Sequence, residues 1–325
     1  CNGTGMVSGN AVTLNNGIVN GQQALLGGYA TLDSAVTGNK VTMSGGTVNG
    51  SIRGGYAYRS NYYATGDVTK NSVEITGGTV NGGGYIRGGE SMTGAASENS
   101  VSIENATING DNTNSIYGGY SVSGEVNKNT VSISNMDNLD ADVTGGRTNG
   151  DAEASYNKVK LSNVTFNSVE HPNRTSFSAG GGSSEKGIAE GNELEVHNII
   201  LTGGLTGGNG NVANNNKVTI SGADTQITLT SGTVGSQIMG GSGKTKATGN
   251  IVTIESGIIT GNADSSIVAG RVNNFSSDVD YVTEENTVKI NGGTVVVDIY
   301  GGYGLYGSAI NNAVEISGGI IASKQ

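Results

Sequence analysis

An internal repeat constrains the fold of this 325-residue chain more than any other feature. Residues 39–56 (NKVTMSGGTVNGSIRGGY) are the clearest copy, and related segments recur from one end of the chain to the other. Each copy has an alternating run, a short second run after a glycine pair, and an aliphatic residue before another glycine pair. Self-similarity at a fixed period is typical of repeat architectures. We therefore predict one elongated domain over residues 1–325.

The first run of each copy reads Asn, any residue, aliphatic, any residue, aliphatic. Copies start about every 30 residues, at Asn10, Asn39, Asn71, Asn99, Asn129, Asn157, Asn192, Asn216, Asn250, Asn286 and Asn312. In each of the eleven, the residue between the two aliphatic positions is polar, from Thr13 in the first to Glu315 in the last. A period of two indicates a strand with one buried face.

A parallel β-solenoid satisfies these constraints. A second short run and a third run follow the first in most copies, and the third carries an aliphatic residue two positions before a small pair. These aliphatic residues are Leu25, Ile52, Ile86, Ile116, Val143, Leu205, Ile238, Ile267 and Ile299. We expect an all-β, parallel β-helix with about three short strands per coil and ten to eleven coils of about 30 residues. A propeller would need four strands in about 40 residues or more per blade.

Stacked coils would align equivalent side chains into columns. Aliphatic residues would form a narrow continuous core, because a single coil cannot bury them alone. The Asn at each coil start would join a ladder of amides, which donate and accept between neighbouring coils. The glycine pair, such as Gly54 and Gly55, would let backbones approach at a bend.

Composition narrows the functional classes. The net charge is −10, with 17 Lys and Arg against 27 Asp and Glu, and there is no cluster of basic residues to bind a phosphate backbone. We therefore predict no nucleic-acid partner, and we find no membrane span in this chain. One Cys excludes an internal disulfide framework. Cys1 is consistent with the lipidated start of a mature lipoprotein or, as we prefer, with a boundary of the chain.

Few residues suggest catalysis or metal binding. Two acidic groups lie near arginines and could hold a cation or form solvated loops: Asp137, Asp140 and Asp142 near Arg147, and Asp278, Asp280, Glu284 and Glu285 near Arg271. We favour solvated loops. His171 and His197 are the only histidines, which argues against a zinc site. We predict no catalytic residue, no metal site and no cofactor.

A column of aromatic and basic residues is the main candidate binding site. The residue after the small pair is Tyr29, Tyr56, Tyr120, Arg147, Arg271 or Tyr303 in six copies. Stacked on a solenoid, they would form an exposed stripe that could contact sugar rings or a protein. The alternative, which we favour, is that each Tyr only covers the strand corner. Tyr58, Arg59, Tyr62 and Tyr63 form a second candidate patch in a long connection. Within residues 39–56, Arg53 and Tyr56 are the candidates for contact.

The repeats resemble those in passenger domains of bacterial autotransporters, the type V secreted surface proteins. The resemblance is carried by residues 39–56, 71–89, 99–120 and 286–303, with weaker copies elsewhere. It implies a right-handed β-helix that is poor in Cys and acts as an adhesin or a stalk. It also implies an extracellular location at the bacterial cell surface, either attached to the outer membrane or secreted. The GDSGS motif of the family's protease branch is absent.

Three functional hypotheses follow. The first is a cell-surface structural or adhesive solenoid that extends from the surface and contacts a host or bacterial glycan or protein. The second is an extracellular filament subunit that self-associates through its coil ends. The third is a polysaccharide-active β-helix enzyme.

Overall fold

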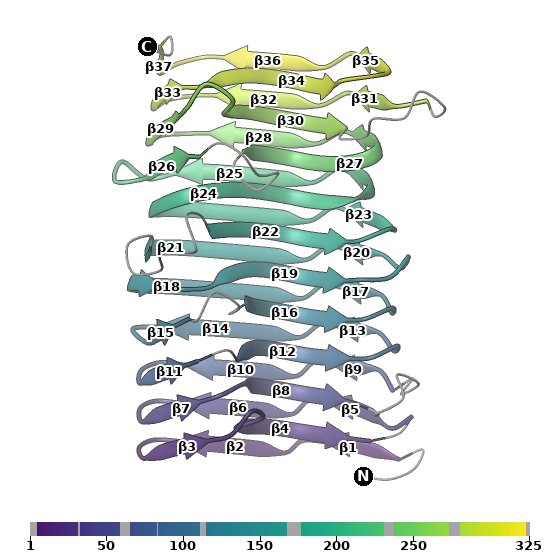
Figure 1. The fold of residues 1–325 in the computed structure, drawn as a ribbon, viewed down its shortest axis with the longest axis vertical. Coiled ribbons are helices and arrows are strands. Elements are labelled where there is room, and N and C mark those ends of the chain that lie inside the picture. The colour runs from purple at the N-terminus through teal and green to yellow at the C-terminus, as the bar shows by residue number, and fades with distance from the viewer. Residues whose placement is uncertain are drawn as a thin grey trace.

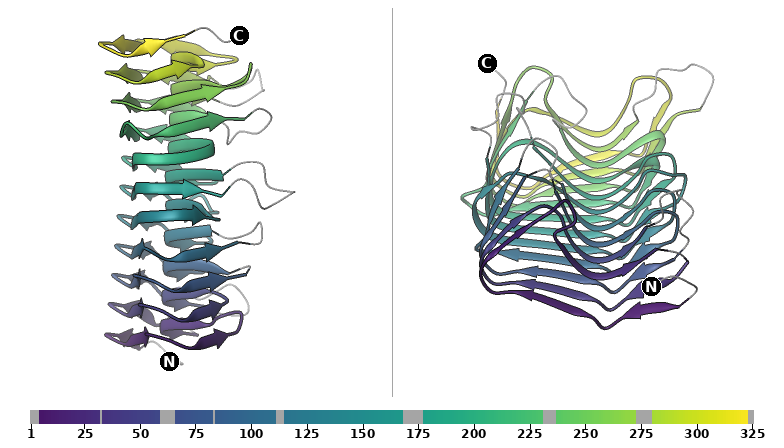
Figure 2. Two further views of the ribbon diagram at one scale, coloured as in Figure 1. Left: turned by 90° about the vertical axis from the view of Figure 1, so that its left-hand side faces the viewer. Right: turned by 60° about the horizontal axis from the view of Figure 1, so that its bottom comes forward.

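The computed structural model describes residues 5–31, 33–58, 66–82, 84–110, 115–167, 177–230, 237–272 and 280–322. These residues form an all-β solenoid in which coils stack along one axis, with the N-terminus at one end and the C-terminus at the other (Figures 1 and 2). There are about nine turns of about 30 residues. The predicted β-solenoid is confirmed, although ten to eleven coils is slightly high as a number of full turns.

Eleven strands form the first column, one for each predicted Asn start. They pair in parallel and in register, for example Val41 with Val73 and Val73 with Val101. The column contains β2 (Ala11–Leu14), β6 (Lys40–Met43), β10 (Ser72–Ile75), β14 (Ser100–Glu104), β18 (Thr130–Leu139), β21 (Lys158–Phe166), β24 (Glu193–Asn214), β25 (Lys217–Ser221), β28 (Ile251–Ile254), β32 (Thr287–Ile290) and β36 (Ala313–Ile316).

The second column is shorter in each rung. It contains β3 (Ile18–Asn20), β7 (Thr47–Asn49), β11 (Thr79–Asn81), β15 (Thr107–Asn109), β26 (Gln226–Leu229), β29 (Ile258–Gly261), β33 (Thr294–Val296) and β37 (Ile320–Ile321). In the middle of the rod, β18, β21 and β24 continue through the corner as single strands. Asn135, Asn163 and Asn198 turn those corners with φ of 53°, 54° and 50°, a conformation that Asn tolerates because its short side chain bonds locally.

The third column holds the glycine pairs. It contains β4 (Leu25–Ala30), β8 (Ile52–Ala57), β12 (Tyr85–Ser91), β16 (Ser115–Ser121), β19 (Asp142–Thr148), β22 (Phe177–Ser184), part of β24, β27 (Ile238–Thr248), β30 (Ser266–Val272) and β34 (Asp298–Gly304). The predicted aliphatic residues of this run align, as Ile52, Ile86 and Ile116 show.

A fourth short strand, which the sequence analysis missed, closes most coils just before the Asn. Its members are β1 (Met6–Ser8), β5 (Ala35–Thr37), β9 (Val68–Thr69), β13 (Ala96–Ser97), β17 (Val126–Asn127), β20 (Ala154–Ser155), β23 (Ile188–Glu190), β31 (Val282–Glu284) and β35 (Ser308–Ile310). Its residues Val36 and Val68 pack with Ala30 and Ala57, which end the third-column strands β4 and β8. They form a second core beside the main aliphatic core of the first three columns.

The predicted Asn ladder is present over all eleven starts. Each Asn donates from Nδ2 to Oδ1 of the next Asn, as in Asn129 to Asn157 (3.0 Å) and Asn157 to Asn192 (3.0 Å). The same Oδ1 accepts the backbone N–H of the preceding Asn, and the second Nδ2 hydrogen goes to a fourth-strand carbonyl, such as Val126 O (2.8 Å). Asn157 is fully buried. Its side chain is therefore hydrogen-bonded on every side, as a buried amide must be.

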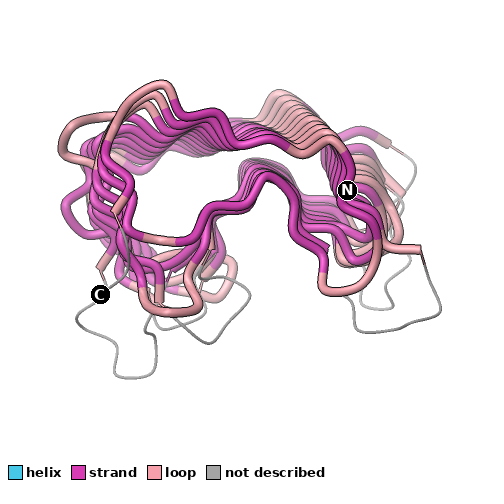
Figure 3. Tube along the Cα trace, turned by 90° about the horizontal axis from the view of Figure 1, so that it is seen from above, coloured by secondary structure: helices cyan, strands magenta, loops and turns pink. Residues whose placement is uncertain are grey.

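The glycine pair brings the third strand directly onto this ladder. A Cβ placed on Gly146 would lie 2.4 Å from Asn157 Oδ1, and one on Gly119 would lie 2.5 Å from Asn129 Cγ. Seen along the axis, the third-strand run bends inward toward the first-strand run (Figure 3). The Asn ladder and the glycine pairs therefore lie between the main core and the second core and separate them.

Candidate functional site

The predicted stripe does align along the outer face of the third column. In register, Tyr29 lies beside Tyr56, Tyr120 beside Arg147, and Arg271 beside Tyr303. The full column reads Tyr29, Tyr56, Glu90, Tyr120, Arg147, Ser183, Asn209, Ser242, Arg271 and Tyr303. Glu90 therefore interrupts the stripe near its start, and three small polar residues divide it in the middle.

The six stripe residues differ in exposure. Tyr29 (37%) and Arg147 are exposed, Tyr120, Arg271 and Tyr303 are half-buried, and Tyr56 is buried (4%). The rings of Tyr29 and Tyr58 lie 5.6 and 5.5 Å from the Tyr56 ring, and the guanidinium of Arg53 lies 4.7 Å from it. Tyr56 is therefore not an exposed contact residue as the stripe model expected. Of the second predicted patch, Arg59, Tyr62 and Tyr63 lie outside the described residues.

A buried ion cluster underlies this part of the stripe. Arg53 and Arg87 occupy equivalent positions on β8 and β12, one rung apart. Both contact Glu90, Arg53 through Nε and Arg87 through Nη1 at 2.6 Å. The three side chains are only 6–7% exposed. We call Arg53, Arg87 and Glu90 the arginine cluster. Two cations against one anion leave it with a formal charge of +1.

Tyrosine rings enclose the arginine cluster. The Arg87 guanidinium lies 3.9 Å from the Tyr85 ring centroid and 4.0 Å from that of Tyr120, within cation–π range. Arg147 donates to Tyr117 Oη at 3.4 Å, which continues the contacts to the next rung. Such packing keeps outward-facing side chains out of water. For that reason every residue of β8 is buried, whereas exposure alternates along β6.

Burial of Tyr56 predicts that the folded protein loses stability at alkaline pH. Desolvation raises the pKa of Tyr56, and the nearby Glu90 carboxylate adds to the effect. The folded state then favours the neutral phenol. Its stabilising contribution is complete below about pH 10, the pKa of Tyr in an unfolded chain, and is lost as pH rises above that value. We expect the urea midpoint to fall between about pH 8 and about pH 11 and Tyr56→Phe to reduce that fall. Tyr306→Phe, at an exposed position, should not; equal effects of the two would contradict the prediction.

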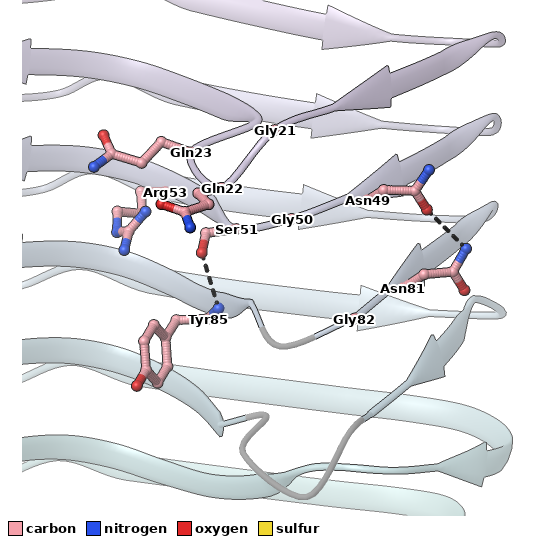
Figure 4. A pocket seen from close by; sticks show the side chains of 10 residues that line it. All are labelled: Gly21, Gln22, Gln23, Asn49, Gly50, Ser51, Arg53, Asn81, Gly82 and Tyr85. Carbon is pink, nitrogen blue, oxygen red and sulfur yellow. Dashed lines mark hydrogen bonds between the residues drawn. The ribbon is translucent and has the colours of Figure 1, made fainter.

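A hollow of about 590 Å³ adjoins the arginine cluster (Figure 4). Gln22 and Gln23 line it from one coil, Asn49, Ser51 and Arg53 from the next, and Asn81 and Tyr85 from a third. Turn glycines form its floor. We call it the Arg53 hollow. Two hydrogen bonds fix its walls: Asn81 Nδ2 donates to Asn49 Oδ1 (3.0 Å), and Tyr85 N donates to Ser51 Oγ (3.1 Å).

A second hollow, of about 280 Å³, lies where the stripe is interrupted. Arg147 borders it on one side and Met239 on the other, with Gly180, Ser183 and Asn209 between them. Small side chains here replace the Tyr and Arg found in other rungs. Farther along, Arg271 contacts Gln237 through Nη1 and lies 5.6 Å from the Tyr303 ring. Desolvation lowers the pKa of Arg271.

Two carboxylates of the first acidic group accept backbone N–H groups. Asp140 Oδ2 accepts the N–H of Gly110 (2.9 Å), and Asp142 Oδ1 accepts that of Ser178 (2.7 Å). Of the second group, Glu284 lies 3.9 Å from Lys246 Nζ, while Asp278 lies outside the described residues. Within the described ranges, no group of three or more His, Cys, Asp and Glu side chains could hold a metal ion.

His197 lies beside a hydroxyl that the sequence did not reveal. Its Nδ1 is 3.1 Å from Ser221 Oγ. A nucleophilic serine must give its proton to the base, yet Ser221 Oγ donates to the Val196 carbonyl at 3.2 Å. In this arrangement Ser221 accepts from His197 rather than donating to it. The geometry of the pair is therefore that of a structural hydrogen bond and not that of a nucleophile with its base. His171 lies outside the described residues.

The arginine cluster was only half visible in the sequence. Arg53 stood out as a candidate contact, but Arg87 and Glu90 did not. The available signal was that Arg precedes the glycine pair in two successive copies, and that Glu90 replaces the Tyr of the copies on either side. Stacking in register brings these residues of successive copies into contact.

None of the described residues forms a helix long and apolar enough to cross a membrane. No protein-family model, curated protein or solved structure matches this chain, so the assignment of function depends on the fold and the surfaces described above.

Proposed function

We propose that this chain is a bacterial cell-surface solenoid, similar to an autotransporter passenger, that extends from the surface and makes adhesive contact through its third-column face. The observation that supports this most strongly is the concentration of Tyr and Arg side chains on that one face. Tyr29 and Arg147 are its exposed members among the stripe residues, and Tyr120, Arg271 and Tyr303 are half-buried. Tyr and Arg are the residues most enriched at the centres of protein contacts.

The rest of the molecule fits a spacer. Eleven rungs at a strand spacing of about 4.8 Å give a rod about 50 Å long. The outer face of the first column carries polar residues and paired charges, such as Lys40 with Glu74 (2.5 Å) and Lys289 with Glu315 (3.3 Å). Such exposed pairs add little stability, but they keep that face hydrated and leave the third-column face as the distinctive one.

Beads coated with the purified chain provide the test. We expect them to capture host epithelial or bacterial cells, and the triple variant Tyr29→Ala/Arg147→Ala/Tyr303→Ala to capture several-fold fewer. A matched variant on the opposite face, Thr13→Ala/Lys160→Ala/Lys289→Ala, should bind like the unmodified chain. Absence of capture across several cell types would contradict an adhesive role. Equal loss in both variants would contradict the assignment to the third-column face.

Self-assembly into filaments is the second candidate, because the last described rung exposes its aliphatic column. Val314 is 42% exposed, Ile316 56% and Ile321 42%, whereas their counterparts Val288, Ile290 and Val295 in the preceding rung are buried. A further rung would cover them. Electron microscopy of the purified chain should then show head-to-tail rods, and Ile316→Lys/Ile321→Lys should abolish them. Isolated particles at every concentration would count against the filament.

A further inference from the structure

The Arg53 hollow contains an electrostatic imbalance that a ligand could relieve. Arg53 and Arg87 share the single carboxylate of Glu90, and Arg53 Nη1 is buried with no hydrogen-bond partner among the described residues. A buried cationic donor without an acceptor is costly. The protein as a whole carries a net charge of −10. The positive charge of the arginine cluster therefore favours binding of an anion in the hollow that Arg53 lines.

The other walls offer hydrogen bonds and an aromatic surface. Gln22 and Gln23 are exposed. Asn49 and Asn81 are bonded within a column of Asn side chains, because Asn49 Nδ2 donates to Asn20 Oδ1 (2.6 Å) and Asn81 Oδ1 accepts from Asn109 Nδ2 (2.8 Å). The Gln amides are therefore the ones available to a ligand. Each primary amide supplies a donor and an acceptor at fixed separation, a pairing that suits the neighbouring hydroxyl groups of a sugar ring. Tyr85 is half-buried and lies at the side of the hollow near Arg53 (Figure 4). Its ring could pack against the apolar face of such a sugar.

The glycine floor of the hollow lets a sugar ring approach the backbone closely. Gly50 has φ of 148°, and a Cβ there would lie 1.7 Å from the carbonyl oxygen of Gly21 in the adjacent coil. No side chain can therefore rise from this point of the floor. The hollow is held open between the amide wall and the Arg53 and Tyr85 wall.

The backbone of the hollow argues against an added peptide strand or a phosphate held by backbone N–H groups as the occupant. Gly21 N donates to Asn49 O (3.1 Å), Ser51 N to Gln22 O (3.1 Å), and Gly82 N to Asn109 O (3.2 Å). These N–H groups are therefore unable to pair with an added peptide strand or to form an anion-binding nest for phosphate. A carboxylate needs only one planar guanidinium edge.

We propose that the Arg53 hollow binds an acidic sugar unit of a surface polysaccharide, with the sugar carboxylate on Arg53, the ring against Tyr85 and the hydroxyls on the amides of Gln22 and Gln23. This inference rests on the proposed adhesive function and specifies the chemistry of one contact site. The site lies beside the predicted stripe and uses Arg53 rather than the stripe's exposed members.

Calorimetric titration of the purified chain with two matched probes tests the proposal. Methyl galacturonoside carries a carboxylate, and methyl galactoside has the same ring without it. We expect saturable binding of the first and at least about tenfold weaker binding of the second, a difference of about 1.4 kcal/mol. Equal affinity for the two, or no saturable binding of the uronoside, would overturn the proposal.

Three variants test the location. Arg53→Gln and Tyr85→Ala should each weaken uronoside binding about tenfold or more. Because Arg53→Gln also disturbs Glu90, the rim variant Gln22→Ala/Gln23→Ala provides a test that leaves the arginine cluster intact, and it should weaken binding several-fold. Arg147→Ala, at an exposed arginine of the stripe, should not. Full binding by both the rim variant and Tyr85→Ala would place the sugar elsewhere.

Further experiments distinguish failure of this inference from failure of the adhesive function on which it rests. An acidic tetrapeptide that binds in place of the uronoside would overturn the sugar assignment. Cell capture by coated beads without uronoside binding would leave the adhesive function standing and remove this site from it. Uronoside binding without cell capture would support the site and contradict the adhesive function.

Discussion

Replacing Asn157 with Ala is expected to destabilise the solenoid by about 4 kcal/mol. The change removes the acceptor for both the N–H and the Nδ2 of Asn129 (3.0 Å each) and the donor to Val126 O (2.8 Å). It also ends the bond to Asn192 Oδ1 (3.0 Å). All these groups are buried, and each unsatisfied group costs about 1–3 kcal/mol. Urea denaturation followed by circular dichroism measures the loss.

The matched control is Asn109→Ala. Asn109 also donates to an equivalent Asn in the adjacent coil, Asn81 (2.8 Å), but at an exposed position. Water can replace that bond, so the change should cost less than about 1 kcal/mol. Similar losses at the two positions would show that burial of the ladder is not the source of its stability.

Gly146→Ala is expected to destabilise by about 3 kcal/mol or to prevent folding. The added Cβ would lie 2.4 Å from Asn157 Oδ1 and 2.5 Å from its Cγ. Overpacking of a filled interior typically costs about 1–3 kcal/mol, and here the displaced group is a buried amide held on every side. Thermal and urea denaturation of the purified variant measure the effect.

Gly180→Ala is the matched control for this prediction. Gly180 lies on β22, in the same column, but faces outward, and the atom nearest to an added Cβ would be Thr206 O at 3.4 Å. Its stability should change by less than about 1 kcal/mol. The double variant Gly146→Ala/Asn157→Ala should lose less than the sum of the single losses, because the new methyl group occupies space vacated by the amide. Strict additivity would contradict a direct clash.

The sequence was sufficient to predict the columns because the same residue type recurs at the same position in each copy. Eleven Asn starts predicted the ladder, and their aliphatic partners predicted the main core. The fourth strand was missed because its two or three residues, such as Ala96 and Ser97, are too short and too small to show an alternating pattern.

The burial of Arg53, Arg87 and Glu90 could not be read from one strand. Alternation places Arg53 and Arg87 on the outer face. The bend at Gly88 and Gly89, both of which pack against the interior, returns Glu90 to that face. Charged side chains on an outer face are normally solvated. These three side chains are buried because the third-strand run bends inward and neighbouring rungs supply tyrosines that cover them. That property belongs to several stacked rungs together. The register of the stripe was predicted correctly because the repeat within each copy sets it. The exposure of the stripe was not predicted, because it depends on side chains from the neighbouring rungs.

The Asn ladder also gives the rod a direction. Along it, each amide donates one Nδ2 hydrogen to the Oδ1 of the following Asn and accepts at its own Oδ1 from the preceding one. The Asn–Asn bonds therefore all point the same way, and their amide dipoles add along the axis. A rod that continued the ladder of another would have to join it head to tail, which is the geometry of an open, unidirectional assembly.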